Sequence, residues 1–331
     1  MNWNWEQARI AIVTVLLALI PPVLFMNSYV SRLFTLIIIF AVMAMALNIV
    51  FGHTDQLFLF SGALMGTGSY TTVLLAQWLG ITPWISLLAG ALLAGFVGAL
   101  VCYVATRQNL SVLVIAILTL ALQLAFIQFV SGASSITGGS TGQVFVGFGL
   151  EGIADSIPGP ELTILYYIVL TVFVATMLVY YYITHSKYGL AFDALRQDEL
   201  AAESVGIDVV RYKTIAGFTA AFIIGFIGPF YVQMNTYIQP SIFGFGSIDV
   251  LVLIMLILGS LRTLLGPLVG SVILLYVNQQ LQSAGQWSTV ILGLLLMFLF
   301  LFFRQGIVTY VSTLIEERTD IGERIRSLGS S

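Results

Sequence analysis

The chain has 331 residues, of which 59% are hydrophobic and only 8% are charged, and its formal net charge is -3. A soluble domain carries about a quarter charged residues, so this composition excludes a soluble globular protein. The small net charge, without an aromatic and basic stripe, also argues against nucleic-acid binding. Apolar stretches long enough to cross a hydrocarbon core of about 30 Å as helices predict an all-α, polytopic membrane protein.

About ten transmembrane helices are predicted in chain order. They cover residues 10–26, 33–51, 62–80, 84–106, 110–130, 162–183, 214–236, 248–261, 266–282 and 288–304. The first is interpreted as a retained span at the lipid-facing edge, ending at Pro21 and Pro22, because no basic region or cleavage site marks a signal peptide. Residues 1–304 would form the transmembrane domain, and residues 305–331 a cytoplasmic tail.

The distribution of positive charge predicts how the chain is oriented. With a cytoplasmic N-terminus, ten crossings return the C-terminus to the cytoplasm, and all of the 12 Lys and Arg residues except Arg32 then fall on the cytoplasmic side. Cytoplasmic loops are enriched in Lys and Arg, so both termini are predicted to be cytoplasmic. Spans two to five and seven to ten would run in opposite directions, as in transporters built from two inverted repeats.

A Gly-rich polar stretch, GHTDQLFLFSGALMGTGSY, follows the second predicted span. A break at membrane depth is tolerated only where protein or a water-filled cavity surrounds it. We therefore take Ser61, Gly62 and Gly66 as candidates for lining a translocation path. His53 and Asp55 have two interpretations: ordinary cytoplasmic loop residues, which is the favoured one, or functional intramembrane groups if the break is re-entrant.

Later spans contain further candidates for the path or its gate. Thr119 and Gln123 interrupt an apolar span, where they would either form hydrogen bonds between helices or line a polar conduit. Gly228, followed by a proline, predicts a kink in the seventh span. Ser247 and Asp249 begin the eighth span, where a serine N-cap and an acid at the positive end of the helix dipole are also sufficient explanations.

The polar island 185–213, HSKYGLAFDALRQDELAAESVGIDVVRYK, gathers about a third of the charged residues of the chain. Its periodicity predicts an amphipathic helix over 192–205 that ends at Gly206. A solvated loop helix is one interpretation. The alternative is a docking helix, in which Ala201 and Ala202 leave a low surface that enters a groove on another protein, while Arg196 and Glu199 fix its orientation.

This island resembles the cytoplasmic coupling loop of permease subunits of bacterial and archaeal ABC importers. In particular, it is similar to the branched-chain amino-acid permease family, including its relatives that carry urea or short amides. Three other segments, all within about 33–300, share the resemblance. They are Ser61, Gly62, Gly68 and Tyr70 in the Gly-rich stretch; Thr137, Gly138, Gly139, Ser140 and Gly142, which resemble TGGSNG; and Ser247, Asp249, Gly259, Thr263, Gly266, Pro267 and Gly270.

The chain departs from the family pattern at two places. TDQLFLF replaces the usual small polar run, and Ser260 and Arg262 stand where the family usually has glycine. The resemblance implies a coupling helix around Glu199 to Gly206 that docks in a separate ATPase. It also implies that Thr137, Gly138, Gly139 and Gly142, within the external loop 131–161, lie where an external solute-binding protein docks.

The resemblance further implies a prokaryotic inner-membrane transport subunit that is not an enzyme. Its partners would be a second, homologous permease, two ATP-binding subunits that hold ATP and Mg, and the binding protein, and its substrate a branched-chain amino acid or a small amide such as urea. The chain itself has no P-loop, metal-ligand spacing or nucleophile elbow, and too few buried acids for a proton relay. The lone Cys102 is interpreted as a packing residue. A self-contained secondary transporter or channel is the alternative function.

Overall fold

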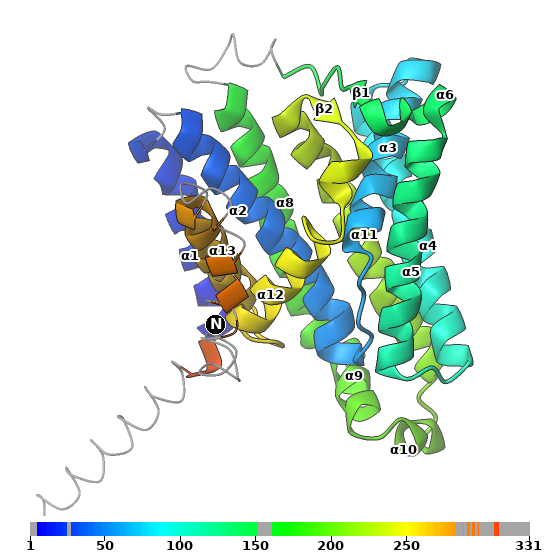
Figure 1. Ribbon diagram of the computed structural model, residues 1–331. Helices are drawn as coiled ribbons and strands as arrows, with labels where there is room; N and C mark the ends of the chain where they lie inside the picture. The colour runs from blue at the N-terminus through cyan, green and yellow to red at the C-terminus, as the bar shows by residue number, and fades with distance from the viewer. Residues whose placement is uncertain are drawn as a thin grey trace, which may run out of the picture.

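A computed structural model describes residues 5–24, 28–150 and 161–281, together with isolated positions between 287 and 310. The tenth predicted span and the predicted cytoplasmic tail lie largely outside the described residues. The described chain is a bundle of helices with one two-stranded sheet at one end (Figure 1). The prediction of an all-α membrane protein is therefore confirmed.

A helix lies over each predicted span that the structure describes. These helices are α1 (Trp5–Leu24), α2 (Ser28–Leu47), α3 (Ser61–Leu79), α4 (Pro83–Arg107), α5 (Val112–Gly132), α8 (Glu161–Thr184), α11 (Val209–Asn235), α12 (Asp249–Gly259) and α13 (Gly266–Leu281). Among the described residues, five segments are both long enough and apolar enough to cross a membrane: Tyr29–Gly52, Pro83–Arg107, Val112–Gly132, Leu162–Thr184 and Val209–Asn235. The ten crossings and the inverted repeats remain predictions.

Small residues bring α3, α4 and α11 into close contact. A Cβ atom at Gly68 would clash with the backbone of Gly225, and one at Gly98 would clash with the side chain of Ala221. Helices without a hydrophobic driving force between them associate through such close packing. These three helices therefore form the scaffold on which the other segments are placed.

Helix α1 lies at the edge of the bundle, as predicted. Its exposed face includes Val15 and Leu16, while the hydroxyl of Tyr166 on α8 donates to the Leu17 carbonyl oxygen at 2.8 Å. The helix continues through Pro21 and Pro22 to Leu24, so the predicted end at the proline pair is wrong. The lipid-facing position itself stays a prediction.

Two of the helices begin inside the bundle rather than at its ends (Figure 1). Helix α2 passes into a π-helix, η1 (Asn48–Gly52), and after a further turn the non-helical segment 55–60 runs back up to α3. From the other end of the bundle, a short 3-10 helix, η3 (Pro240–Phe243), and residues 244–248 descend to α12. The break after α2 is therefore re-entrant.

Short elements close the upper end of the bundle in Figure 1. They are α6 (Ser134–Thr137), the 3-10 helix η2 (Gly139–Thr141), β1 (Gln143–Val144) and β2 (Tyr237–Ile238). The two strands pair antiparallel, with Gln143 opposite Ile238 and Val144 opposite Tyr237. The predicted loop 131–161 therefore carries regular structure in its first part, and its residues 151–160 lie outside the described chain.

Candidate functional site

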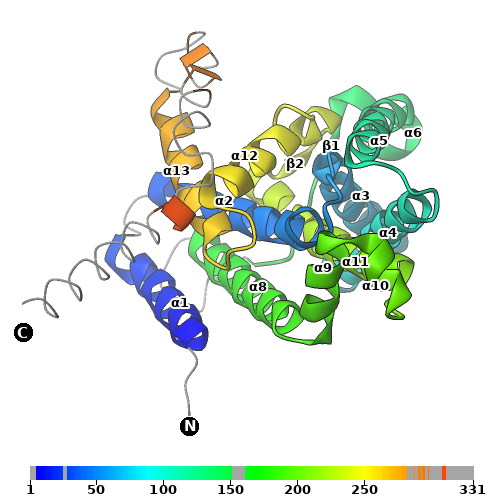
Figure 2. The same ribbon diagram turned by 90° about the horizontal axis from the view of Figure 1, so that it is seen from below.

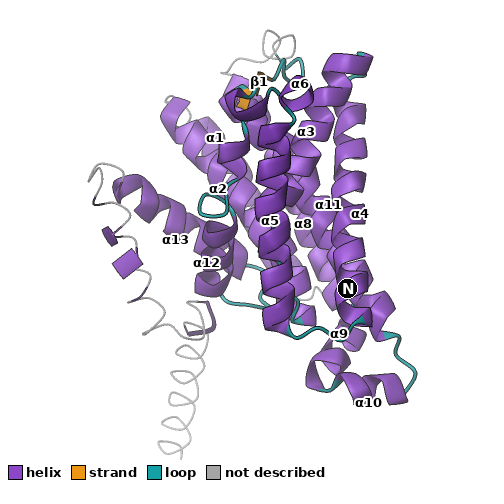
Figure 3. Cartoon of the chain, turned by 45° about the vertical axis from the view of Figure 1, so that its right-hand side comes forward, coloured by secondary structure: helices purple, strands orange, loops and turns teal. Residues whose placement is uncertain are grey.

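At the lower end of the bundle, α9 (Lys187–Gln197) and α10 (Glu199–Ser204) form a projection, which we call the knob (Figures 1 and 3). Seen from below, the knob lies beneath the ends of α4 and α11 and away from α1 (Figure 2). The predicted single helix over 192–205 is wrong in one respect, because Asp198 adopts an extended conformation and divides it into two.

Both ends of α10 are fixed by local hydrogen bonds. The Asp198 carboxylate caps its N-terminus, accepting from the backbone N–H groups of Leu200 and Ala201 at 2.9 and 3.1 Å. At its C-terminus, Gly206 has φ +87°, and the N–H groups of Gly206 and Ile207 donate to the carbonyls of Glu203 and Ala202. This is the Schellman arrangement, which favours glycine at that position, so the predicted stop at Gly206 is confirmed.

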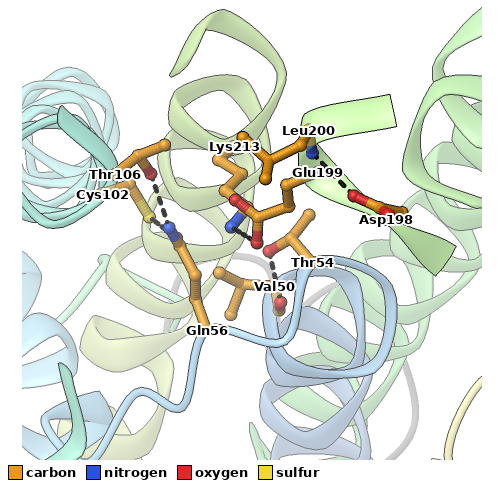
Figure 4. Close-up of polar contacts among 9 residues, drawn as sticks. All are labelled: Val50, Thr54, Gln56, Cys102, Thr106, Asp198, Glu199, Leu200 and Lys213. Carbon is orange, nitrogen blue, oxygen red and sulfur yellow. Dashed lines mark hydrogen bonds and ion pairs between the residues drawn. The ribbon is translucent and has the colours of Figure 1, made fainter. Parts of the chain in front are cut away.

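An ion pair ties the knob to a long helix. The Lys213 ammonium lies 2.6 Å from a carboxylate oxygen of Glu199, and the Lys213 side chain is only 9% exposed whereas that of Glu199 is 49% exposed (Figure 4). A nearly buried charge that loses its partner is costly. Because Lys213 belongs to the first turns of α11, a displacement of α10 acts on a helix that extends to the opposite end of the bundle.

The re-entrant segment passes close to this ion pair (Figure 4). The Gln56 side chain donates to the Thr106 hydroxyl at 2.8 Å and accepts from the Cys102 thiol at 2.6 Å. Cys102 is buried, which agrees with a packing role. The ion pair, α4 and the start of the re-entrant segment are therefore neighbours.

The outer surface of the knob combines charged and apolar groups. Arg196, Glu199 and Ala201 are exposed, as are Leu200 and Val205, which keep 78% and 76% of their surface. Ala202 differs from its predicted place, since it is 3% exposed and packs against the core of the chain itself. Of the two alanines expected on the exposed face of the knob, only Ala201 is there, and Ala202 is buried.

Beside the knob, a second group of polar contacts joins η1 to the loop after α12. The Asn48 side chain accepts from the Arg262 backbone N–H at 2.8 Å and donates to the Thr263 carbonyl oxygen at 3.2 Å. The Arg262 guanidinium donates to the Gly52 carbonyl oxygen at 2.6 Å and lies 3.8 Å from Asp55. These contacts fix the end of α2 against the end of α12.

His53 lies just beyond the membrane-spanning segment Tyr29–Gly52, at the wall of a cavity of about 310 Å³ near the knob. Its Nε2 atom is 2.9 Å from the Tyr180 hydroxyl. Burial lowers the pKa of His53 to about 4; Asp193 raises it, and Arg262 and Arg196 lower it further. His53 thus lies at the knob end of the bundle, and its favoured interpretation as a cytoplasmic loop residue stays a prediction.

At mid-height, α3 and α12 begin beside each other, and their first residues meet a side chain of α5. We call this meeting point the junction; it consists of Ser61, Gly62, Gln123, Phe243 and Asp249. The Gly62 N–H donates to Asp249 Oδ1 at 3.1 Å, and the Ala63 N–H donates to Gln123 Oε1 at 2.5 Å. The Gln123 amide in turn donates to the Phe243 carbonyl oxygen at 2.6 Å.

A known protein family, described as branched-chain amino acid transport system, permease component, matches residues 29–302. The chain belongs to this family. The permease is 26% identical over 294 residues to the high-affinity branched-chain amino acid transport system permease protein LivM of Escherichia coli, which is 83% of this chain and 68% of LivM. It is 25% identical over 240 residues to a probable branched-chain amino acid transport permease protein LivH of Methanocaldococcus jannaschii, which is 70% of this chain and 73% of LivH. No solved structure matches the chain.

The permease brings together four of the path residues predicted from its sequence: Ser61, Gly62, Gln123 and Asp249 meet at the junction. Gly66 borders the junction, since a Cβ atom there would lie 3.3 Å from Phe243. Thr119, Gly228 and Ser247 are not among its residues. Gly66 packs against Phe126, and Gly228 packs against Met65. Thr119 binds the re-entrant segment, accepting from the Leu59 N–H at 3.0 Å.

Ser247 is not the N-cap of α12 as predicted. It is exposed, Ile248 occupies the N-cap position, and no side-chain hydrogen bond is made there. Asp249 lies in the first turn of α12, as predicted. The same acid also accepts from α3, which the sequence did not indicate.

The predicted binding-protein site lies at the other end of the permease. Thr137 closes α6, and the three glycines Gly138, Gly139 and Gly142 all have positive φ. Gly142 also lies against β2, where a Cβ atom would clash with the Ile238 carbonyl oxygen. These glycines are therefore explained by the local backbone, and the neighbouring Ser140 and Thr141 are exposed.

Sequence reasoning missed Lys213 as the partner of Glu199, and Asn48 as the residue that holds the loop after α12. A polar residue inside an apolar span is functional by default, so Asn48 carried a usable signal. Lys213 belonged to the run that resembles the family's coupling loop, but nothing in the sequence indicated that it pairs with Glu199.

Proposed function

We propose that this permease is a membrane subunit of an ATP-driven importer that carries branched-chain amino acids, or related small amides such as urea, across a prokaryotic inner membrane. Its partners are a second, homologous permease, two ATPase subunits that hold ATP and Mg, and an external binding protein. The family and the names of its relatives support the substrate class. The chain serves as the path, and the ATPases supply the energy.

The observation that carries this proposal is the ion pair between Glu199 and Lys213. The knob exposes Leu200 and Val205 to its surroundings, as a surface that enters a groove of another protein would. Its position is passed to α11 through a contact with a nearly buried ammonium. Closure of the ATPases around the knob would thus move α11, and with it the scaffold of α3 and α4.

The proposed orientation places the knob in the cytoplasm. Arg107, Lys187, Arg196 and Arg211 belong to elements whose ends lie at the knob end of the bundle. Arg32 donates to Asn235 at the last residue of α11, and thus lies at the opposite end. This separation supports cytoplasmic N- and C-termini by the positive-inside rule.

The proposed architecture is a pair of inverted repeats, the first from α2 to α5 and the second from α11 to the tenth span. Its support is the matching break in each half. The re-entrant segment 55–60 leads to α3 from the knob end, and residues 244–248 lead to α12 from the other end. Inverted repeats place solute sites where their broken helices meet, near the middle of the membrane.

We assign the translocation path to the junction and the docking of the binding protein to the opposite end, around residues 137–142. Each permease would open its junction toward the interface with the other. Because Gly142 is fixed by its backbone, Ser140 and Thr141 are the better positions at which to test docking. A self-contained carrier or channel is the alternative function, and solute flux through the reconstituted chain without any ATPase would support it.

The decisive experiment replaces Lys213 with methionine in the complete importer reconstituted into liposomes. Lys213→Met keeps the length of the side chain but removes its charge, and Glu199 remains half-exposed to water. We expect ATP hydrolysis to persist while ATP-driven leucine uptake falls by about tenfold or more, equivalent to a loss of about 1.4 kcal/mol of coupling. The matched control is Arg107→Met, which removes an exposed cation at the end of α4, outside the knob.

Arg107→Met should leave both activities at the wild-type level. Equal uptake by Lys213→Met and wild type would contradict the coupling role of the knob. If the wild-type importer takes up no leucine when ATP and the binding protein are supplied, the proposal that it carries branched-chain amino acids is contradicted.

A further inference from the structure

The junction contains acceptor atoms that are buried and have no partner in the described chain. Asp249 and Ser61 are each only 1% exposed. Among the described residues, neither Asp249 Oδ2 nor Ser61 Oγ makes a hydrogen bond. Leaving such groups unpaired inside a protein is unfavourable. A permease that keeps two of them at one place therefore has a use for them in another conformation.

The electrostatics of the junction limit what it can accept. Two helices begin here, and each N-terminus carries about half a positive charge. Together the two N-termini offset the charge of one carboxylate, and Asp249 supplies that carboxylate. A solute that enters without upsetting this balance must have no net charge. Simple cations and simple anions are thereby disfavoured.

The hydrogen-bonding groups limit the solute further. Asp249 Oδ2 calls for a donor, and Ser61 Oγ can accept from one as well as donate, whereas the backbone N–H groups at the start of α3 call for an acceptor. In this structure the Asp249 carboxylate itself accepts from the Gly62 N–H. A solute carboxylate that took this place would release Asp249 to accept from a solute ammonium group. A neutral molecule with both groups on one carbon is an α-amino acid.

We propose that the junction is the recognition site for the α-ammonium and α-carboxylate groups of the transported solute, with Asp249 and Ser61 accepting from the ammonium and the start of α3 donating to the carboxylate. This inference rests on the proposed function, since it concerns the solute of the same path. The Gln123 side chain bridges the two sides of the site, because its amide links the Ala63 N–H to the Phe243 carbonyl oxygen. Movement of α5 would open both contacts together.

Ser61 gives the sharpest test, because its hydroxyl has no partner in the described chain to lose. If Ser61 is only structural, Ser61→Ala should leave the melting temperature unchanged or raise it and leave transport intact. If it recognises the solute, stability should again be preserved but leucine binding should weaken severalfold. The matched control is Ser271→Ala on α13, a serine that is equally buried and bonds only to its own helix at Leu268 in the contacts described.

The experiment measures binding of radiolabelled leucine to the complete permease and ATPase assembly in nanodiscs, without the binding protein. Competitors are leucine methyl ester, which lacks the carboxylate; 2-hydroxyisocaproate, which lacks the ammonium; and isovaleramide, a neutral amide. We expect each to bind the wild type about tenfold more weakly than leucine. In Asp249→Asn, leucine should lose its advantage over 2-hydroxyisocaproate.

The inference is overturned if wild-type assembly does not bind leucine, if isovaleramide competes as well as leucine, or if Ser61→Ala and Asp249→Asn both bind leucine as the wild type does. Should Asp249→Asn fail to assemble, the result for Ser61→Ala decides alone. ATP-driven uptake by the wild-type importer with its binding protein is measured in parallel. Uptake that persists in these cases leaves the proposed function standing while the recognition site falls.

Discussion

The junction and the knob both place an acid at the start of a helix, but they neutralise it in different ways. Glu199 in the knob is half-exposed and has the Lys213 ammonium at 2.6 Å. Asp249 in the junction is buried and accepts from a backbone N–H at 3.1 Å. Near water, a flexible lysine side chain is sufficient to neutralise the acid. Inside the bundle, fixed helix ends perform the same task without adding a charged side chain, which leaves room for a solute to exchange partners.

The glycines of the two regions differ in the same sense. Gly62 of the junction is required by space, because a Cβ atom would clash with the Phe243 carbonyl oxygen and lie 2.9 Å from the Gln123 amide. Gly206 of the knob has no atom within 4 Å of such a Cβ, and is required instead by its φ of +87°. Crowding by neighbouring atoms therefore requires glycine in the junction, and backbone conformation requires it in the knob.

Replacing each glycine with alanine should give the largest difference between the two regions. Gly62→Ala overpacks a site bounded by backbone, and should lower the free energy of unfolding by about 3 kcal/mol. Gly206→Ala places alanine in the left-handed region, and should cost about 1 kcal/mol. Thermal unfolding of the purified permease in detergent measures both. Equal losses would show that the junction is less tightly packed than the distances indicate.

Acidification should affect the knob end of the permease through His53. Its pKa in the folded chain, about 4, lies below the ordinary value of 6.5, mainly because of burial. As the pH falls below 6.5, the unfolded chain takes up the proton first, so stability is complete above this value and declines toward pH 4. At about pH 5, the loss should be about 2 kcal/mol.

The measurement compares the melting temperatures of wild type and His53→Gln between pH 7.5 and 4.5. This range extends about one unit above and about two units below the histidine's ordinary pKa. His53→Gln cannot take up this proton, so its melting temperature should fall less steeply with acid. Parallel curves for the two proteins would contradict the burial of a neutral imidazole beside Tyr180.

These differences explain which parts of the permease were predictable from its sequence. The helices followed from apolar length, and the stop at Gly206 followed from a local backbone rule. The island was visible as charge, but its division at Asp198 depended on a cap that competes with a continuous helix. The meeting of Gly62, Gln123 and Asp249 joins residues from three distant segments, and only the fold could show it. The family resemblance named several of the same residues without indicating that they touch.

The smallest predicted effect concerns the loop that follows α12, the helix that starts at the junction. Ser260 has φ +102° and Arg262 has φ +62°, in the region of backbone conformation that favours glycine. Such conformations cost of order 1–3 kcal/mol for a residue with a side chain. The Ser260 hydroxyl offsets part of this cost by accepting from the Thr309 N–H at 3.1 Å.

Two substitutions at Ser260 separate the strain from the hydrogen bond. Ser260→Ala loses the bond and keeps the strain, whereas Ser260→Gly loses both. The free energy of unfolding should therefore be about 1 kcal/mol higher for Ser260→Gly than for Ser260→Ala. The value for the wild type should lie within about 1 kcal/mol of that for the glycine variant. If alanine equals glycine, the loop is unstrained. If the expected order is found, the end of α12 remote from the junction is held under strain, and in Ser260→Gly the relaxed loop should also reduce the coupling of uptake to ATP hydrolysis.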